Sequence, residues 1–139
     1  MALKTNSKAV SGKIKKWLIE GGFNPDYFED CNPGEKVPET AEEMAVAILA
    51  ECDRVTSGDY YTRNYSPFGR FENWCQGLPG ILNTEEWFLH SAVDFVGDLL
   101  EETEEEKARF SEMDAEKMAT RLVYNVIVKA AEKASRKGA

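Results

Sequence analysis

The apolar residues of this chain recur at helical spacing in nearly every segment, and no stretch alternates between apolar and polar positions as a strand would. Residues 11–22 predict a first helix that ends at Gly21-Gly22, because paired glycines are typical of helix ends. Residues 23–39 contain three prolines and predict a loop with a single turn opened by Asn24-Pro25. We therefore expect an all-α fold: one domain over residues 1–139, a bundle of about five helices with a proline-rich loop after the first.

Later helices have recognisable starting signals. Thr40-Ala41-Glu42-Glu43 is a capping box, in which the threonine hydroxyl and the glutamate carboxylate each take a free amide of the first turn. Ser66-Pro67 combines a capping residue with a proline in the first turn, and Thr84 precedes the acidic residues of the next helix. A long final helix is predicted from Asp114 onward, because its valines and isoleucine still follow the helical period.

The same period assigns the core. After the capping box, one stripe holds Met44, Ile48, Cys52 and Val55, and the inner face of the last helix holds Met118, Leu122, Val126 and Ala130. Replacing Phe95 with alanine is expected to cost roughly 3–5 kcal/mol as a large-to-small core change. The complete expected core is Trp17, Leu18, Ile48, Leu49, Phe71, Trp74, Phe88, Phe95, Leu99, Leu122 and Val126.

Charge is distributed very unevenly along the chain, whose net charge is −8. Residues 1–19 carry five lysines and no acid, residues 20–116 carry 24 acids against six bases, and residues 117–139 carry six bases and one acid. Direct binding of nucleic acid through the acidic body is disfavoured, since neutralising phosphates requires clustered lysine and arginine. The distribution instead favours solubility, or a basic protein as the partner.

The most acidic segment, residues 85–106, holds nine carboxylates and the only histidine, with no lysine or arginine among them. Wound as a helix, residues 86–102 separate into an apolar arc of about 160° and a polar arc rich in carboxylates. A charged arc is most often a solvated face. Here, however, like charges one turn apart repel each other, and Trp87 lies in the middle of the polar arc.

A tryptophan surrounded by charges is typical of a binding hot spot, so this polar arc is the predicted partner-binding face. Its residues are Trp87, His90, Asp94, Asp98 and Glu101. We expect a raised pKa for His90, which has Glu86 one turn before it and an aspartate one turn after. Two alternatives stay open: Trp87 can pack as core against residues 78–83, and the arc can imitate DNA, although its charges recur every ~3.7 Å against ~1.7 Å in duplex DNA.

A metal site is the alternative reading of the same arc. Glu86, His90, Asp94 and Asp98 follow one another at i, i+4, and Mg²⁺ or Mn²⁺ would accept their carboxylates. Zinc hydrolysis of the H-E-x-x-H type is excluded, because the chain has one histidine.

The pairs Glu39-x-x-Glu42 and "GDLLEE" around Asp98 resemble the metal boxes of all-α nucleotide pyrophosphohydrolases. The resemblance implies a metal-dependent hydrolase with Mg or Mn as its cofactor. The chain departs from that pattern at Phe95, three residues before Asp98, where the family has a glutamate, and Glu39 and Glu42 straddle a helix start. The leading interpretation therefore needs no cofactor and is not enzymatic.

Other candidate chemistry is limited. A Cys75–His90 nucleophile pair is conceivable, although a cysteine among aromatic core positions is more often inert. The aromatic residues between 60 and 74 can stack bases together with Arg63 and Arg70, but the interpretation we favour places the phenylalanines and Trp74 in the core and the tyrosines at a surface for a partner.

Three cysteines without a C-x-x-C pair, no apolar leader and no apolar run long enough for a bilayer predict a cytoplasmic protein without a membrane segment. The composition does not predict the oligomeric state.

Over residues 60–133, "FENWCQGLPG", the acidic amphipathic helix and "ATRLVYNVIVKAAEK" resemble small acidic proteins of phages and other mobile elements, a family whose function is unknown. The resemblance implies an inhibitor of a host nucleic-acid-binding or defence protein. The sequence therefore predicts an acidic, non-enzymatic protein that docks on a basic macromolecular partner.

Overall fold

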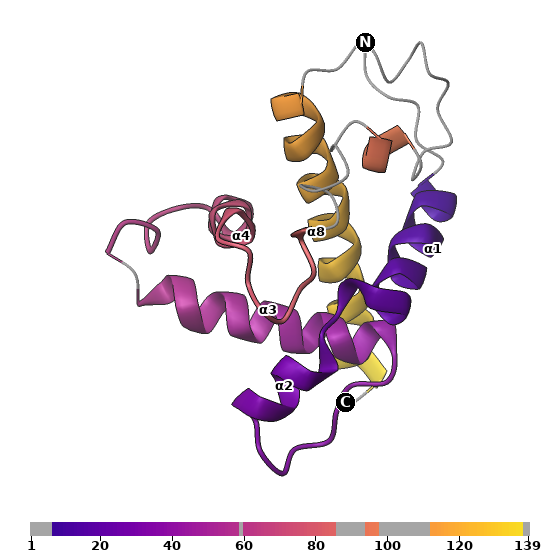
Figure 1. Ribbon diagram of the computed structural model, residues 1–139, viewed down its shortest axis with the longest axis vertical. Helices are drawn as coiled ribbons and strands as arrows, with labels where there is room; N and C mark the ends of the chain where they lie inside the picture. The colour runs from indigo at the N-terminus through magenta and orange to yellow at the C-terminus, as the bar shows by residue number, and fades with distance from the viewer. Residues whose placement is uncertain (1–6, 59, 86–93, 98–111, 138–139) are drawn as a thin grey trace.

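Every regular element in the described part of the chain is a helix, which confirms the all-α prediction. The computed structural model describes residues 7–58, 60–85, 94–97 and 112–137. Figure 1 shows α8 crossing α3 near the centre, with α1 beside α8 and with α4 and α2 on opposite sides of α3 in this view. The elements are α1 (Ser7–Trp17), the π-helical turn η1 (Leu18–Gly22), α2 (Pro25–Cys31), α3 (Ala41–Ser57), α4 (Pro67–Gln76) and α8 (Glu112–Lys137).

Two helix starts follow the predicted caps. Before α3, the Thr40 hydroxyl accepts a hydrogen bond from the Glu43 amide at 3.1 Å, and the Glu43 carboxylate accepts one from the Thr40 amide at 3.2 Å. Before α4, the Ser66 hydroxyl accepts from the Gly69 amide at 3.1 Å, and Pro67 is the first helical residue. These bonds satisfy first-turn amides that no helical carbonyl can reach.

The segment predicted as a proline-rich loop contains a helix of its own, α2, so the prediction of a single turn there is wrong. The Asn24 side chain accepts from the Tyr27 amide at 3.1 Å, and Pro25 opens the helix. The turn extends to seven residues because Phe28 is buried in the core and anchors it. The remainder of the segment, up to Thr40, is irregular.

The main hydrophobic core forms where α3 packs against α8, and α1, α2 and α4 each add residues to it. Five residues of the predicted core are buried there: Leu18, Ile48, Phe71, Trp74 and Val126. Four others are partly buried against this core: Trp17, Leu49, Phe95 and Leu122. The last two, Phe88 and Leu99, lie outside the described residues.

Two of the predicted inner faces need correction. Val55 is 45% exposed, and the inward place at the end of α3 belongs to Thr56, whose hydroxyl donates to the Cys52 carbonyl at 2.7 Å. On α8, Met118 and Leu122 are only partly buried. Val126 and Ala130 are buried as predicted, whereas in the first half of α8 the buried positions are the next ones along; the buried residues are Ala115, Ala119, Val123, Val126, Ile127 and Ala130.

The loops after η1 and α4 are paired with each other. Phe23 and Leu82 form an isolated antiparallel β-bridge, with the Asn83 amide donating to the Gly22 carbonyl at 2.7 Å and the Asn24 amide to the Ile81 carbonyl at 3.0 Å. Ile81 and Leu82 are buried, so this pairing fixes the start of α2 against the core. Among the described helices, none has the length and apolar character that crossing a membrane requires.

Candidate functional site

Most of the predicted partner-binding face lies outside the described residues. Trp87, His90, Asp98 and Glu101 fall there, as does Glu86 of the metal alternative. Asp94 is described, and it is exposed in a helical turn over residues 94–97.

The opposite side of that turn is apolar and packed. Phe95 meets the Trp17 ring edge-on, with ring centroids 6.0 Å apart, and Val96 is buried in a small cluster with Ala115 and Ala119. Within residues 94–97, the polar residue Asp94 is exposed and the apolar residues Phe95 and Val96 are packed, as the amphipathic pattern predicted. The structure thus places Asp94 on a solvent-facing side, while the other residues of the predicted face stay a prediction.

The first metal box implied by the pyrophosphohydrolase resemblance is not arranged as one. Glu39 precedes α3, and its amide donates to the Glu43 carboxylate at 3.2 Å. Glu42 lies within α3 and forms an ion pair with Lys133 of α8 at 3.7 Å. The described residues contain no group of three or more histidine, cysteine, aspartate or glutamate side chains that could hold a metal ion. Asp98 of the second box is outside the described residues.

Cys75 is a packing residue in this fold. Its side chain is buried between α4 and the loop that follows, and burial raises the pKa of its thiol far above the ordinary value. Cys52 is buried as well, and burial raises its pKa to about 11. Because the thiolate is the nucleophilic form, neither cysteine is suited to catalysis.

The aromatic segment after α3 divides as expected. Phe71 and Trp74 are buried, and Phe68 is partly buried beneath the Arg121 guanidinium, which lies 4.4 Å from its ring centroid. Tyr60 and Tyr61, in contrast, are 72% and 78% exposed. These tyrosines are therefore at the surface.

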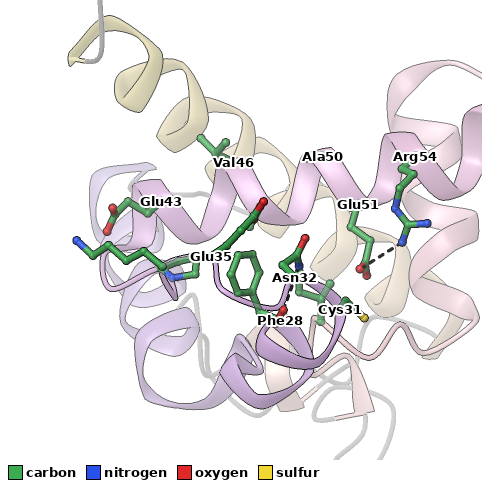
Figure 2. Close-up of a pocket in the computed structure, with 13 residues that line it drawn as sticks. Phe28, Cys31, Asn32, Glu35, Glu43, Val46, Ala50, Glu51 and Arg54 are labelled. Carbon is green, nitrogen blue, oxygen red and sulfur yellow. Dashed lines mark hydrogen bonds and ion pairs between the residues drawn. The ribbon is translucent and has the colours of Figure 1, made fainter.

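A groove with a volume of about 810 Å³ lies between α2, the loop that follows it and α3. Figure 2 shows that Phe28 and Asn32 border it from the α2 side and Val46, Ala50 and Glu51 from α3. Its apolar lining residues are Phe28, Pro38, Val46, Ala47, Ala50 and Ile81. Its polar lining residues are Cys31, Asn32, Glu35, Lys36, Glu43, Glu51 and Arg54.

Glu51 is the unusual residue of this groove, because its carboxylate side chain is only 8% exposed. The guanidinium of Arg54, one turn further along α3, lies 3.6 Å from the carboxylate and is itself 69% exposed. Burial raises the pKa of Glu51, and the Arg54 charge and the nearby Tyr27 side chain, which both favour the charged carboxylate, only partly oppose this.

Tyr27 of α2 lies near this carboxylate. Burial, a hydrogen bond with the Cys31 thiol and the nearby Glu51 charge together raise the pKa of Tyr27 to about 12. Its ring also packs closely over Gly80 of the loop after α4. The carboxylate of Glu51 therefore has neighbours from two helices.

Exposed carboxylates are frequent on the segments that form the groove, and we call them the acidic surface; two of them, Glu35 and Glu43, line the groove itself. Residues 20–58 contain ten acids and two bases, and both bases, Lys36 and Arg54, line the groove. The acidic surface consists of Asp26, Glu29, Asp30, Glu35, Glu39, Glu43 and Asp53, all exposed. Within the described ranges, only Asp53 of this set forms an ion pair, with Arg70 at 3.6 Å.

Comparisons with protein families, curated proteins and solved structures gave no match to this chain. The functional interpretation therefore rests on the arrangement of the residues in this chain.

The groove and the acidic surface were not predicted from the sequence, which drew attention to residues 85–106 instead. One signal was available: Glu51 lies between Ile48 and Cys52 of the apolar stripe of α3, with an arginine three residues later. A charged residue next to an inward-facing stripe is typical of a buried carboxylate with a partner. The contribution of α2 could not be anticipated, because its segment was interpreted as a loop.

Proposed function

We propose that this protein acts by binding a basic macromolecular partner, without catalysis, through the acidic surface around the α2–α3 groove. The observation that carries the proposal is the excess of eight acids over bases in residues 20–58, where seven carboxylates are exposed and two of them, Glu35 and Glu43, line a groove that is partly apolar. An apolar centre within a charged rim is the composition of a protein interface.

The energetics favour a partner of opposite charge. Carboxylates gathered without compensating cations repel one another, and a basic surface relieves that repulsion when it docks. Each exposed pair contributes little, but the set steers association and sets its salt dependence. Asp94 and the predicted face at Trp87, His90, Asp98 and Glu101 would extend the same acidic character over residues 85–106.

A narrower form of the proposal follows from the resemblance to acidic proteins of phages and mobile elements. Host proteins that bind nucleic acid have basic faces, because they neutralise phosphates. An acidic protein that covers such a face would inhibit the host or defence protein that bears it.

Affinity capture from the cytosol of the host, repeated at increasing salt, tests this function. We expect the wild type to capture a basic protein that is released as salt rises. A variant with Asp26→Asn, Glu29→Gln and Asp30→Asn should fail to retain this protein. Retention of the same protein by the variant at every salt concentration would contradict the proposal.

The alternative is a metal-dependent nucleotide pyrophosphohydrolase that uses Mg²⁺ or Mn²⁺ on helical carboxylates. A bound metal stabilises the folded state in proportion to its occupancy, by about 2.7 kcal/mol at 100 times its Kd. Titrating either cation while following the melting temperature separates the two functions. The binding protein is expected to show almost no shift, whereas a saturable rise of several degrees would support the hydrolase.

A further inference from the structure

The α2–α3 groove combines two features that match a long basic side chain. Part of its lining, which we call the floor, is apolar and includes Phe28 of α2 and Val46 and Ala50 of α3. Its wall holds a carboxylate, Glu51, that solvent reaches only slightly. Arginine and lysine have the same two-part character, since an aliphatic stem carries a charged end.

We propose that this groove receives an arginine side chain of the basic partner, with its stem on the apolar floor and its guanidinium on the Glu51 carboxylate. This inference rests on the proposed function and names the group that the acidic surface recognises. Arginine fits better than lysine because its planar guanidinium can pair with a carboxylate in two parallel hydrogen bonds and can stack on a ring such as Phe28.

The ion pair between Glu51 and Arg54 is loose enough for an incoming arginine to take the place of Arg54. The Arg54 guanidinium is 3.6 Å from the carboxylate, longer than the ~2.7–2.9 Å of a charge-assisted hydrogen bond. Arg54 is also largely exposed, so it can move into water without losing buried contacts. An incoming guanidinium can therefore approach Glu51 more closely than Arg54 does.

The surroundings of Glu51 keep the carboxylate ready for that partner. Glu51 lies within the regular helix α3 and its side chain is only 8% exposed, so the residues around it restrict its position before binding. Fixed groups lower the entropic cost of association. At the far rim, Lys36 lies near Glu43 and lowers the pKa of that carboxyl, after the larger effect of the Glu39 and Thr40 amides. The nearby carboxylate thus offsets the charge of Lys36.

The groove is larger than one arginine side chain requires. Its volume of about 810 Å³ lies within the ~300–1,000 Å³ typical of ligand pockets. Residues next to the arginine would therefore enter as well, beside Glu35 and Glu43. The expected ligand is a segment of a protein, with an arginine at its centre and further basic residues on either side.

The test is a double-mutant cycle with two short lysine-flanked peptides, one carrying a central arginine and one carrying citrulline, its neutral isostere. Each is titrated by calorimetry into the wild-type full chain, into Glu51→Gln and into Glu20→Gln. Glu20 is the matched control, because it is exposed in η1, does not line the groove and is not part of the acidic surface. In wild type and in Glu20→Gln we expect arginine to bind about tenfold more tightly than citrulline, the value of one charged hydrogen bond. In Glu51→Gln this preference should vanish.

A second variant keeps the test decisive if Glu51→Gln folds poorly. Ala50 is exposed on α3 and lines the groove, so Ala50→Tyr should fill it without disturbing the core and should remove the same preference.

An arginine preference that survives in both variants would overturn the groove inference. If both peptides bind alike and weaken with salt, the acidic surface binds basic partners but the groove does not select arginine. If neither peptide binds at low salt, the proposed function fails as well.

Discussion

Glu51 is an acid in a nearly buried position, and its protonation should influence stability. Its pKa in the folded protein is raised, mainly by burial, while Arg54 and Tyr27 favour the charged form. The folded state therefore holds this proton more tightly than the unfolded state, and the stability contributed by Glu51 is lost as pH rises through the folded pKa.

This sign gives a testable prediction for Glu51→Gln. The free energy of unfolding of the wild type, relative to this variant, is expected to be highest below the unfolded pKa of glutamate, about 4.3, and to fall as pH rises through the folded pKa. Urea denaturation of both proteins over this range measures the difference. If the difference in free energy of unfolding is constant or rises with pH, burial does not destabilise the charged form of the Glu51 carboxylate.

Gly80 is required for the position of Tyr27. A Cβ atom at Gly80 would overlap the Tyr27 ring, so Gly80→Ala must displace this side chain, which lies near Glu51. We expect a loss of about 1–3 kcal/mol in the free energy of unfolding, the usual cost of overpacking. Gly58→Ala is the control, because a Cβ there meets open space and its φ of −87° suits alanine. Equal effects of the two changes, measured by denaturation, would contradict this close contact.

At the scale of elements, local signals in the sequence predicted where helices begin and end. The Thr40–Glu43 capping box, the Ser66-Pro67 start and the glycines at 21–22 all lie where the helices of the structure begin or end. These signals act within one turn, so they can be recognised without knowing the rest of the fold.

Packing between elements was less predictable. The helix α2 exists because Phe28 reaches the core, and no local pattern shows that a single aromatic residue will do so. The same reason explains why Thr56 is buried at the end of α3 and Val55 is exposed. Which of two neighbouring helix positions faces the core depends on the elements that pack against the helix, and the sequence of the helix does not show these. The groove arises between α2 and α3, so it could not be predicted once α2 was interpreted as a loop.

The correction to the core alters which mutation should be most damaging. Phe71 is 0% exposed, whereas Phe95 is partly buried between two clusters. Phe71→Ala should therefore cost about 3–5 kcal/mol, and Phe95→Ala less, in contrast to the expectation from the helical period alone. Chemical denaturation of both variants measures this order, and a larger loss for Phe95→Ala would contradict the burial described here.

At the scale of the whole molecule, net charge differs between segments of the chain. Residues 20–58, which include α2, the following loop and α3, carry ten acids and two bases, while residues 1–19 and 117–139 each carry a net charge of +5. The composition predicted this division correctly, because charge is counted directly from the sequence. It could not predict that α2 and α3 border a groove lined by the nearly buried carboxylate of Glu51.

The most direct test of the acidic surface is the affinity for an oligolysine of about ten residues, measured from about 50 to 200 mM salt. The wild type is compared with the Asp26→Asn, Glu29→Gln, Asp30→Asn variant and with a control of the same net charge, Glu72→Gln, Glu116→Gln, Glu132→Gln, whose residues lie on α4 and α8. We predict that the α2 variant loses most of its affinity and salt dependence, while the control stays close to the wild type. Equal losses in the two variants would show that net charge alone drives binding, and would contradict a binding surface at α2 and α3.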